Sequence, residues 1–127
     1  MNEKQGLQII ICSGPEDARR ATLGFAAALA ACACGMPVTL FLVMDGARWA
    51  LPSEGNEPGA PGFQPVGQLF DSIVAAGGRV EVCSNCVEGV CSAPPQSEPL
   101  SVLRPGVVFG GLASAAIRMG QIPTVTF

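Results

Sequence analysis

The residues of this chain best suited to chemistry are its cysteines. The chain has six cysteines and neither histidine nor tyrosine, and Cys83, Cys86 and Cys91 fall within one short stretch, Val82–Cys91. A thiolate is both a nucleophile and a metal ligand at pH values near neutrality. A Ser–His pair is impossible without histidine, and no pair of carboxylates stands out. The sequence therefore predicts sulfur chemistry and argues against a conventional hydrolase.

Three kinds of sulfur chemistry fit this stretch, beside the simpler interpretation of a loop whose cysteines have no chemical role. One cysteine could carry a persulfide and pass sulfur between partners. Cys83-x-x-Cys86 could be a dithiol redox pair, although the Trp and Pro that flank thioredoxin-type pairs are absent. Cys83, Cys86 and Cys91, with or without Cys12, could bind zinc or an iron–sulfur cluster, but a second Cys-x-x-Cys is missing.

The other candidate residues have weaker signals. Cys12 ends an apolar run and is either a packing residue or a neighbour of the cysteine cluster. Cys32 and Cys34 lie in an alanine-rich segment, where cysteine commonly serves as a small buried hydrophobe. Two glycine-containing turns, Ser13-Gly14 and Gly110-Gly111, could offer backbone N–H groups to an anion. Neither turn belongs to a nucleotide-binding motif, so tight strand-to-helix turns are favoured.

The elements that must position these residues alternate along the chain. β-Branched and apolar runs predict strands over residues 7–12, 38–44, 79–83, 107–109 and 123–127. Patterns with helical spacing predict helices over residues 18–34, 66–76 and 112–119. This alternation predicts an α/β fold, a three-layer α/β/α sandwich with a parallel sheet of about five strands, in one domain over residues 1–127.

In such a sheet the carboxyl ends of the strands meet at one edge, which is where reactive sites lie. This edge should therefore hold the cysteine cluster together with Ser13-Gly14, Asp45-Gly46 and Gly110-Gly111. If a helix begins after Cys83, this thiol lies at the positive end of the helix.

Three further expectations concern packing. In the first helix, one face should hold Leu23, Ala27, Ala30 and Ala31, extended by Phe25 and Leu29. Residues 48–65 contain four prolines and three glycines after Leu51 and are expected to form a long surface loop. Trp49 in this loop could line the site, contact another subunit or pack internally. Residues 92–99 should form an extended connection.

Composition limits the function classes. The net charge of −3, with seven scattered basic residues, gives no footprint for direct nucleic-acid binding. The longest apolar run is too short to cross a membrane, and the first residues lack the features of a signal peptide. A cytoplasmic location is expected, where thiols stay reduced, so the six cysteines are not interpreted as three structural disulfides.

Several segments together resemble the DsrE/DsrF-like (TusD-like) sulfur-relay family. The resemblance extends over nearly the whole chain. It is carried by Leu7–Cys12 with Ser13-Gly14-Pro15, by Met44-Asp45-Gly46, by Gly77-Gly78-Arg79-Val80-Glu81-Val82-Cys83 and by Val107-Val108-Phe109-Gly110-Gly111. The proline-rich segments 52–65 and 92–99 depart from the TusD pattern, and so does the presence of three cysteines where one would suffice.

The resemblance implies a homo-oligomer, a trimer or hexamer, that works as a sulfurtransferase-type sulfur carrier. Family members take sulfur from a donor protein and pass it to an acceptor protein, towards tRNA thiolation or sulfur oxidation. The carrier cysteine maps onto Cys83 or, in other members, onto Cys86. No cofactor is implied beyond the transient cysteine persulfide.

Residues near the carrier would then assist it. A second thiol, Cys86 or Cys91, could resolve a persulfide on Cys83 by forming a disulfide. An arginine, Arg48 or Arg118, could lower the pKa of the reactive thiol. An alternative is a non-catalytic oligomeric or metal-binding module with structural cysteines.

Overall fold

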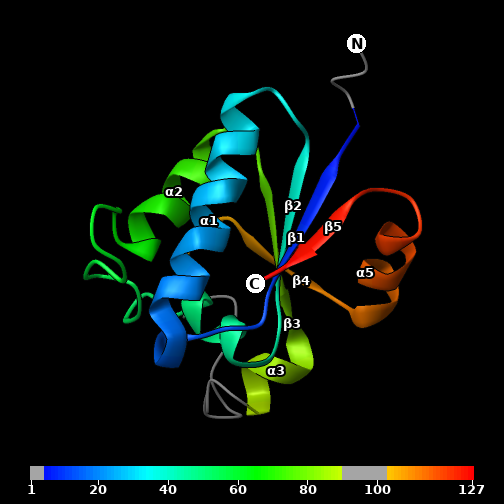
Figure 1. The fold of residues 1–127 in the computed structure, drawn as a ribbon. Helices are drawn as coiled ribbons and strands as arrows, with labels where there is room; N and C mark the ends of the chain where they lie inside the picture. Colours follow the sequence, from blue (N-terminus) through cyan, green and yellow to red (C-terminus); the bar gives the residue numbers. More distant parts are fainter. Residues whose placement is uncertain (1–4, 90–102) are drawn as a thin grey trace.

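The computed structural model describes residues 5–89 and 103–127, and its strands within these residues form one parallel sheet (Figure 1). The sheet has five strands in the order β4-β3-β2-β1-β5. All four pairings are parallel. The bounds are β1 Leu7–Ile11, β2 Val38–Leu42, β3 Arg79–Cys83, β4 Val107–Gly110 and β5 Thr124–Thr126. The predicted parallel sheet is confirmed, and each strand ends within two residues of its predicted limits.

Helices cover both faces of this sheet (Figure 1). On one face lie α1 (Ala18–Ala33) and α2 (Val66–Ala75), and on the other lies α5 (Leu112–Met119). The chain moves across the sheet from β1 to β3 with α1 and α2 in the connections. It then crosses from edge strand β4 to edge strand β5 through α5. The three-layer α/β/α arrangement follows because parallel neighbours need a crossover on one face or the other.

The buried face of α1 matches the predicted one in part. Phe25 and Ala31 are buried as predicted, whereas Leu23 is 53% exposed and Ala30 is exposed. The other buried residues are Ala21, Thr22, Gly24 and Ala28. At Gly24, a Cβ atom would overlap the Ile11 side chain and lie 3.0 Å from the Phe127 ring, so this close approach to the sheet falls beside Leu23 and the leucine points outward.

The surface loop that the sequence predicted over residues 48–65 is present over residues 51–65, but residues 48–50 belong to a helical segment. Residues Met44–Ala50 form a 3-10 helix, η2, in which Ala47, Trp49 and Ala50 are buried. The Trp49 indole packs edge-on against the Phe25 ring, with 6.4 Å between centroids, and its Nε1 donates to the Ser13 carbonyl at 2.8 Å. Trp49 is thus a packing residue that ties η2 to the loop after β1.

Arg104 holds the other side of η2. Its backbone N donates to the Ala50 carbonyl at 2.8 Å, its Nε donates to the Trp49 carbonyl at 3.1 Å, and it also donates to the Glu54 carbonyl. The guanidinium lies over the Phe70 ring. Because Arg104 is buried, these carbonyls replace its lost hydration.

Two predictions fall on residues outside the described part. Cys91 and the expected extended connection over residues 92–99 lie in the stretch 90–102, which the structure does not describe. Within the described part, every helix is too short or too polar to cross a membrane.

Candidate functional site

The cysteine pair lies where β3 passes directly into a helix. β3 ends at Cys83, and the short helix α3 (Ser84–Gly89) begins at the next residue. Cys86 follows in the first turn of α3. Both side chains are buried, with 5% of Cys83 and 8% of Cys86 exposed. The Cys-x-x-Cys pair therefore spans a strand-to-helix junction, which is the local arrangement that a dithiol pair requires.

The loops after β1 and β2 are packed tightly beside this junction. Gly46 N donates to the Cys12 carbonyl at 3.1 Å, and Val43 N donates to the Ile11 carbonyl at 3.0 Å. A Cβ atom at Gly46 would overlap the Ile11 carbonyl, and one at Gly14 would overlap the Asp45 carbonyl. Glycine at these two positions lets the backbones approach, which places Cys12 and Met44 close to α3.

Cys86 is oriented by a backbone amide. Its Sγ accepts a hydrogen bond from Met44 N at 3.1 Å, and Cys83 lies close enough to raise the pKa of the Cys86 thiol. Met44 has φ of 55°, a left-handed conformation that costs a residue other than glycine free energy. The strained backbone aims an amide at the Cys86 sulfur.

Burial raises the pKa of the Cys86 thiol, and burial likewise raises the pKa of the Cys12 thiol. For Cys86 the hydrogen bond from Met44 N acts in the opposite direction, while the contact with Cys83 and the charges of Cys83 and Cys12 add to the rise. Cys86 therefore stays protonated at neutral pH while the site is closed. Cys12, which the sequence left open between packing and the cluster, lies close enough to Cys86 for its charge to affect that thiol.

The described cysteines, Cys12, Cys32, Cys34, Cys83 and Cys86, are all free thiols. Within residues 5–89 and 103–127, no three Cys, Asp, Glu or His side chains are placed to hold a metal ion. The predicted metal set of Cys83, Cys86 and Cys91 includes a residue outside these ranges, so the structure describes only two of its three ligands.

The predicted supporting residues lie on either side of the pair. Gly110 is the strand partner of Cys83 in the β3–β4 pairing, and Gly111 is the N-cap of α5. Gly14 does not offer a free N–H group, because its N donates to Glu16 Oε2 at 2.9 Å. The Ser13 hydroxyl is buried and has no hydrogen-bond partner among the described residues.

An open depression of about 310 Å³ lies at the carboxyl ends of β1 and β5. Its lining comes from the turn after β1, from the start of the following helical segment and from the last two residues. The lining residues are Cys12, Ser13, Glu16, Asp17, Arg20, Thr126 and Phe127. Cys12 is only partly buried, whereas Cys83 and Cys86 are buried. Of these three thiols, Cys12 is therefore the one that lines this surface depression.

The arginines expected beside the cysteines bind carboxylates instead. Arg48 pairs with Glu54 at 3.2 Å, and Arg118 pairs with Glu81 at 2.9 Å. Neither guanidinium is among the groups that shift the pKa of Cys86. The predicted role of Arg48 or Arg118 in activating a thiol is therefore not supported by their contacts.

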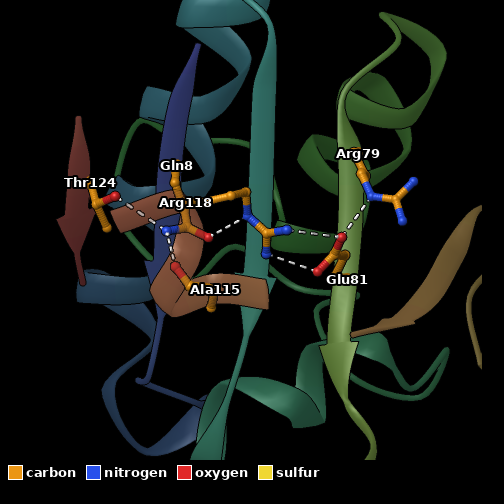
Figure 2. Close-up of polar contacts among 6 residues, drawn as sticks. All are labelled: Gln8, Arg79, Glu81, Ala115, Arg118 and Thr124. Atoms are coloured by element: carbon orange, nitrogen blue, oxygen red, sulfur yellow. Dashed lines mark hydrogen bonds and ion pairs between the residues drawn. The ribbon is translucent and has the colours of Figure 1, made fainter. Parts of the chain in front are cut away.

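A buried polar network between α5 and the sheet was not predicted (Figure 2). Arg118 on α5 spans β2, donating through Nε to Gln8 Oε1 on β1 at 2.7 Å and pairing with Glu81 on β3. Arg79 Nε contacts the same carboxylate at 2.6 Å. Gln8 Nε2 donates to the Ala115 carbonyl and to Thr124 Oγ1, both at 3.2 Å.

The sequence carries a signal for this network. Gln8 and Glu81 are polar residues inside otherwise apolar strands, and both are at least 97% buried. Such residues need a partner, because burying an unpaired charge or amide is costly. Glu81 precedes Cys83 by two residues and so shares its face of the sheet. A Cβ atom at Gly110 would overlap the Glu81 carboxylate. The network thus fixes α5 and the β4–α5 turn beside Cys83.

Comparisons with known proteins agree on the fold. The sequence model of the DsrE/DsrF-like family matches residues 5–121. An uncharacterised protein of Methanocaldococcus jannaschii is 34% identical over 82 residues, which cover 65% of this chain and 30% of that protein. The chain thus matches less than a third of the length of this relative. The crystal structure of the YchN protein from E. coli superposes with a TM-score of 0.76 at 22% identity, over 97% of this chain and 99% of that one.

Proposed function

This chain belongs to the DsrE/DsrF-like family, and we propose that it is a sulfur carrier that accepts and passes on persulfide sulfur through Cys83. The observation that carries the proposal is the position of Cys83. This thiol ends β3 at the carboxyl edge of the parallel sheet, three residues before a second thiol, Cys86. Reactive groups of open α/β sheets gather at this edge.

The proposed chemistry needs a thiolate and a partner. The Cys83 thiolate attacks the outer sulfur of a donor persulfide, a new S–S bond forms at Cys83, and the donor leaves as its thiolate. Because Cys83 is only 5% exposed, a donor reaches it when α3 opens locally. A six-residue helix at a strand end has few contacts to lose and suits such an opening.

The proposed partners are a sulfur-donor protein, a sulfur-acceptor protein and further copies of this chain. Large apolar side chains on α5 support a protein-contact surface, since Leu112 is 62%, Ile117 61% and Met119 50% exposed. We propose a transient cysteine persulfide as the only prosthetic chemistry, in a reducing compartment such as the cytoplasm, where the thiols remain free.

Intact-mass spectrometry after incubation with a low-molecular-weight persulfide tests the carrier assignment. Wild type, Cys86→Ser and the control Cys34→Ser, which changes an exposed thiol at the end of α1, should each gain the mass of one sulfur atom. Cys83→Ser should lose this adduct. An undiminished adduct on Cys83→Ser would exclude Cys83 as the carrier. Absence of any adduct together with stoichiometric zinc would favour the metal-binding module.

A dithiol oxidoreductase is the second candidate, and the Cys-x-x-Cys spacing across the junction of β3 and α3 favours it. Such a protein would exchange with disulfides and take up no sulfur. The Cys86→Ser variant distinguishes the two functions. A carrier would still gain one sulfur atom from a persulfide, whereas an oxidoreductase would show no sulfur adduct and would form a mixed disulfide with oxidised glutathione.

A further inference from the structure

We propose that Cys86 resolves the persulfide carried on Cys83, so that the protein also releases hydrosulfide and closes a Cys83–Cys86 disulfide. This inference rests on the proposed carrier function and adds a second outcome for the bound sulfur. The persulfide is either delivered to an acceptor or discharged inside the site.

The positions of the two thiols suit disulfide formation. Cys83 is the last residue of β3, and Cys86 lies in the first turn of α3. The two cysteines are three residues apart across the junction of β3 and α3, and α3 packs against β3. A disulfide needs Cα atoms within about 7 Å, and the effect of Cys83 on the pKa of Cys86 agrees with such proximity. Cys12 lies in a different segment, directly after β1. It is held there by its backbone, whose N donates to the Phe127 carbonyl and whose carbonyl accepts from Gly46 N.

Met44 orients Cys86 for this role. The hydrogen bond from Met44 N to Cys86 Sγ, at 3.1 Å, fixes the side chain and stabilises negative charge as it develops on that sulfur. The left-handed Met44 backbone is held by Gly46 N, which donates to the Val43 and Cys12 carbonyls at 3.0 and 3.1 Å. The amide is therefore in place before the reaction begins.

Burial favours reaction inside the site over attack from solution. Both sulfurs are almost fully covered, so an external thiol is excluded while α3 is closed. A thiol held beside the persulfide has a far higher effective concentration than any thiol in solution. Whether sulfur is delivered or released then depends on how soon an acceptor opens the site.

The step balances without a further reactant. The Cys86 thiol gives its proton to the terminal sulfur of the persulfide and its sulfur attacks Sγ of Cys83; the bond between Cys83 Sγ and the terminal sulfur breaks, and hydrosulfide leaves with the electron pair and this proton. The sulfane sulfur gains two electrons, and the two cysteines lose them in forming the disulfide. A second turnover needs an added dithiol, which reduces the Cys83–Cys86 bond.

A time course with glutathione persulfide tests this proposal in the full chain. In wild type the sulfur adduct should decay to a species lighter than the reduced protein by two hydrogen atoms, with one hydrosulfide released per disulfide. In Cys86→Ser and Cys86→Ala the adduct should persist, and hydrosulfide release should fall about tenfold or more. Cys12→Ser is the matched control and should behave as wild type.

The outcomes separate the two proposals. An adduct that persists in wild type as long as in Cys86→Ala, with no disulfide, would overturn the resolving role and leave the carrier function intact. Loss of release in Cys12→Ser alone would assign the role to Cys12 and overturn it as well. If neither wild type nor the Cys86 variants gain sulfur, the carrier function itself fails. Circular dichroism of each variant shows whether it is folded.

Discussion

At the scale of single residues, the two thiols of the Cys-x-x-Cys pair have different surroundings. Cys83 closes a strand and is paired through the sheet with Gly110, whereas Cys86 accepts an amide hydrogen bond from a strained residue. Burial outweighs this hydrogen bond and raises the pKa of Cys86. The raised pKa slows the proposed attack of Cys86 on a persulfide at Cys83, which leaves time for an acceptor to take the sulfur.

This difference predicts the pH dependence of Cys86 reactivity. Only the thiolate reacts, and a raised pKa keeps the thiolate fraction small until the pH passes the ordinary thiol range near about 8.5. Alkylation of Cys86 by iodoacetamide, followed by peptide mass spectrometry, should therefore accelerate steadily from neutral pH through this range. The neighbouring charges from Cys83 and Cys12 act in the same direction, and the carboxylates of Asp45 in η2 and Glu88 in α3 are exposed.

The exposed Cys34 provides the internal comparison for this measurement, because its side chain lies open at the end of α1. At each pH, Cys34 should be alkylated faster than Cys86. A rate for Cys86 that levels off below neutral pH would contradict a raised pKa.

At the scale of elements, α5 depends on the buried network for its position. The helix is short, and Ala115 is its one buried residue, so apolar burial contributes little to its docking. The side chain of Arg118 is 19% exposed and that of Glu81 4%, and their ion pair joins α5 to β3. Gln8 adds a hydrogen bond to the α5 backbone at Ala115.

Arg118→Ala should therefore destabilise the protein. The substitution removes the buried partner of Glu81 and leaves only the exposed Arg79 to neutralise it, so we expect a loss of about 3 kcal/mol in urea denaturation. Arg20→Ala is the control, since it breaks an exposed pair with Asp17 and should cost less than about 1 kcal/mol. Equal effects of the two substitutions would show that the network does not anchor α5.

At the scale of the whole molecule, the two faces of the sheet are covered unequally. Helices α1 and α2 pack over one face of the sheet, and the shorter helix α5 packs over the opposite face (Figure 1). Exposed large apolar side chains lie on the α5 side of the sheet. They are Val108, Leu112, Ile117 and Met119. Phe109 and Val125, which are also exposed, face the α1–α2 side at the two edges of the sheet. The surface on the α5 side is our candidate for contacts between copies of the chain.

A charge on α5 should therefore weaken self-association. We expect wild type to elute as an oligomer in size-exclusion chromatography with light scattering, and Leu112→Glu with Ile117→Glu to shift it to smaller species. Leu23→Glu introduces the same charge on α1, on the opposite side of the sheet, at a leucine of similar exposure, and should leave the mass unchanged. A monomeric wild type, or an unchanged double variant, would exclude this surface as the interface.

Much of the fold could be predicted from the sequence, because it depends on local patterns. The apolar runs and the helical spacings set the strands and helices, and their alternation requires parallel pairing. This placed Cys83 at the end of β3 and Gly110-Gly111 at the start of α5, as the structure confirms. Membership of the family also followed from these short motifs.

The tertiary structure alone decided which groups surround the thiols. The contacts of Cys86 with Met44 and of α5 with Glu81 join residues about forty positions apart. They depend on how closely two loops and a helix approach the sheet, and a single Cβ atom at Gly14, Gly46 or Gly24 would prevent that approach. Local spacing contains no information on such distances. The sequence therefore determined where the cysteines of the proposed sulfur chemistry lie along the strands and helices, and three-dimensional packing determined which neighbours each sulfur has.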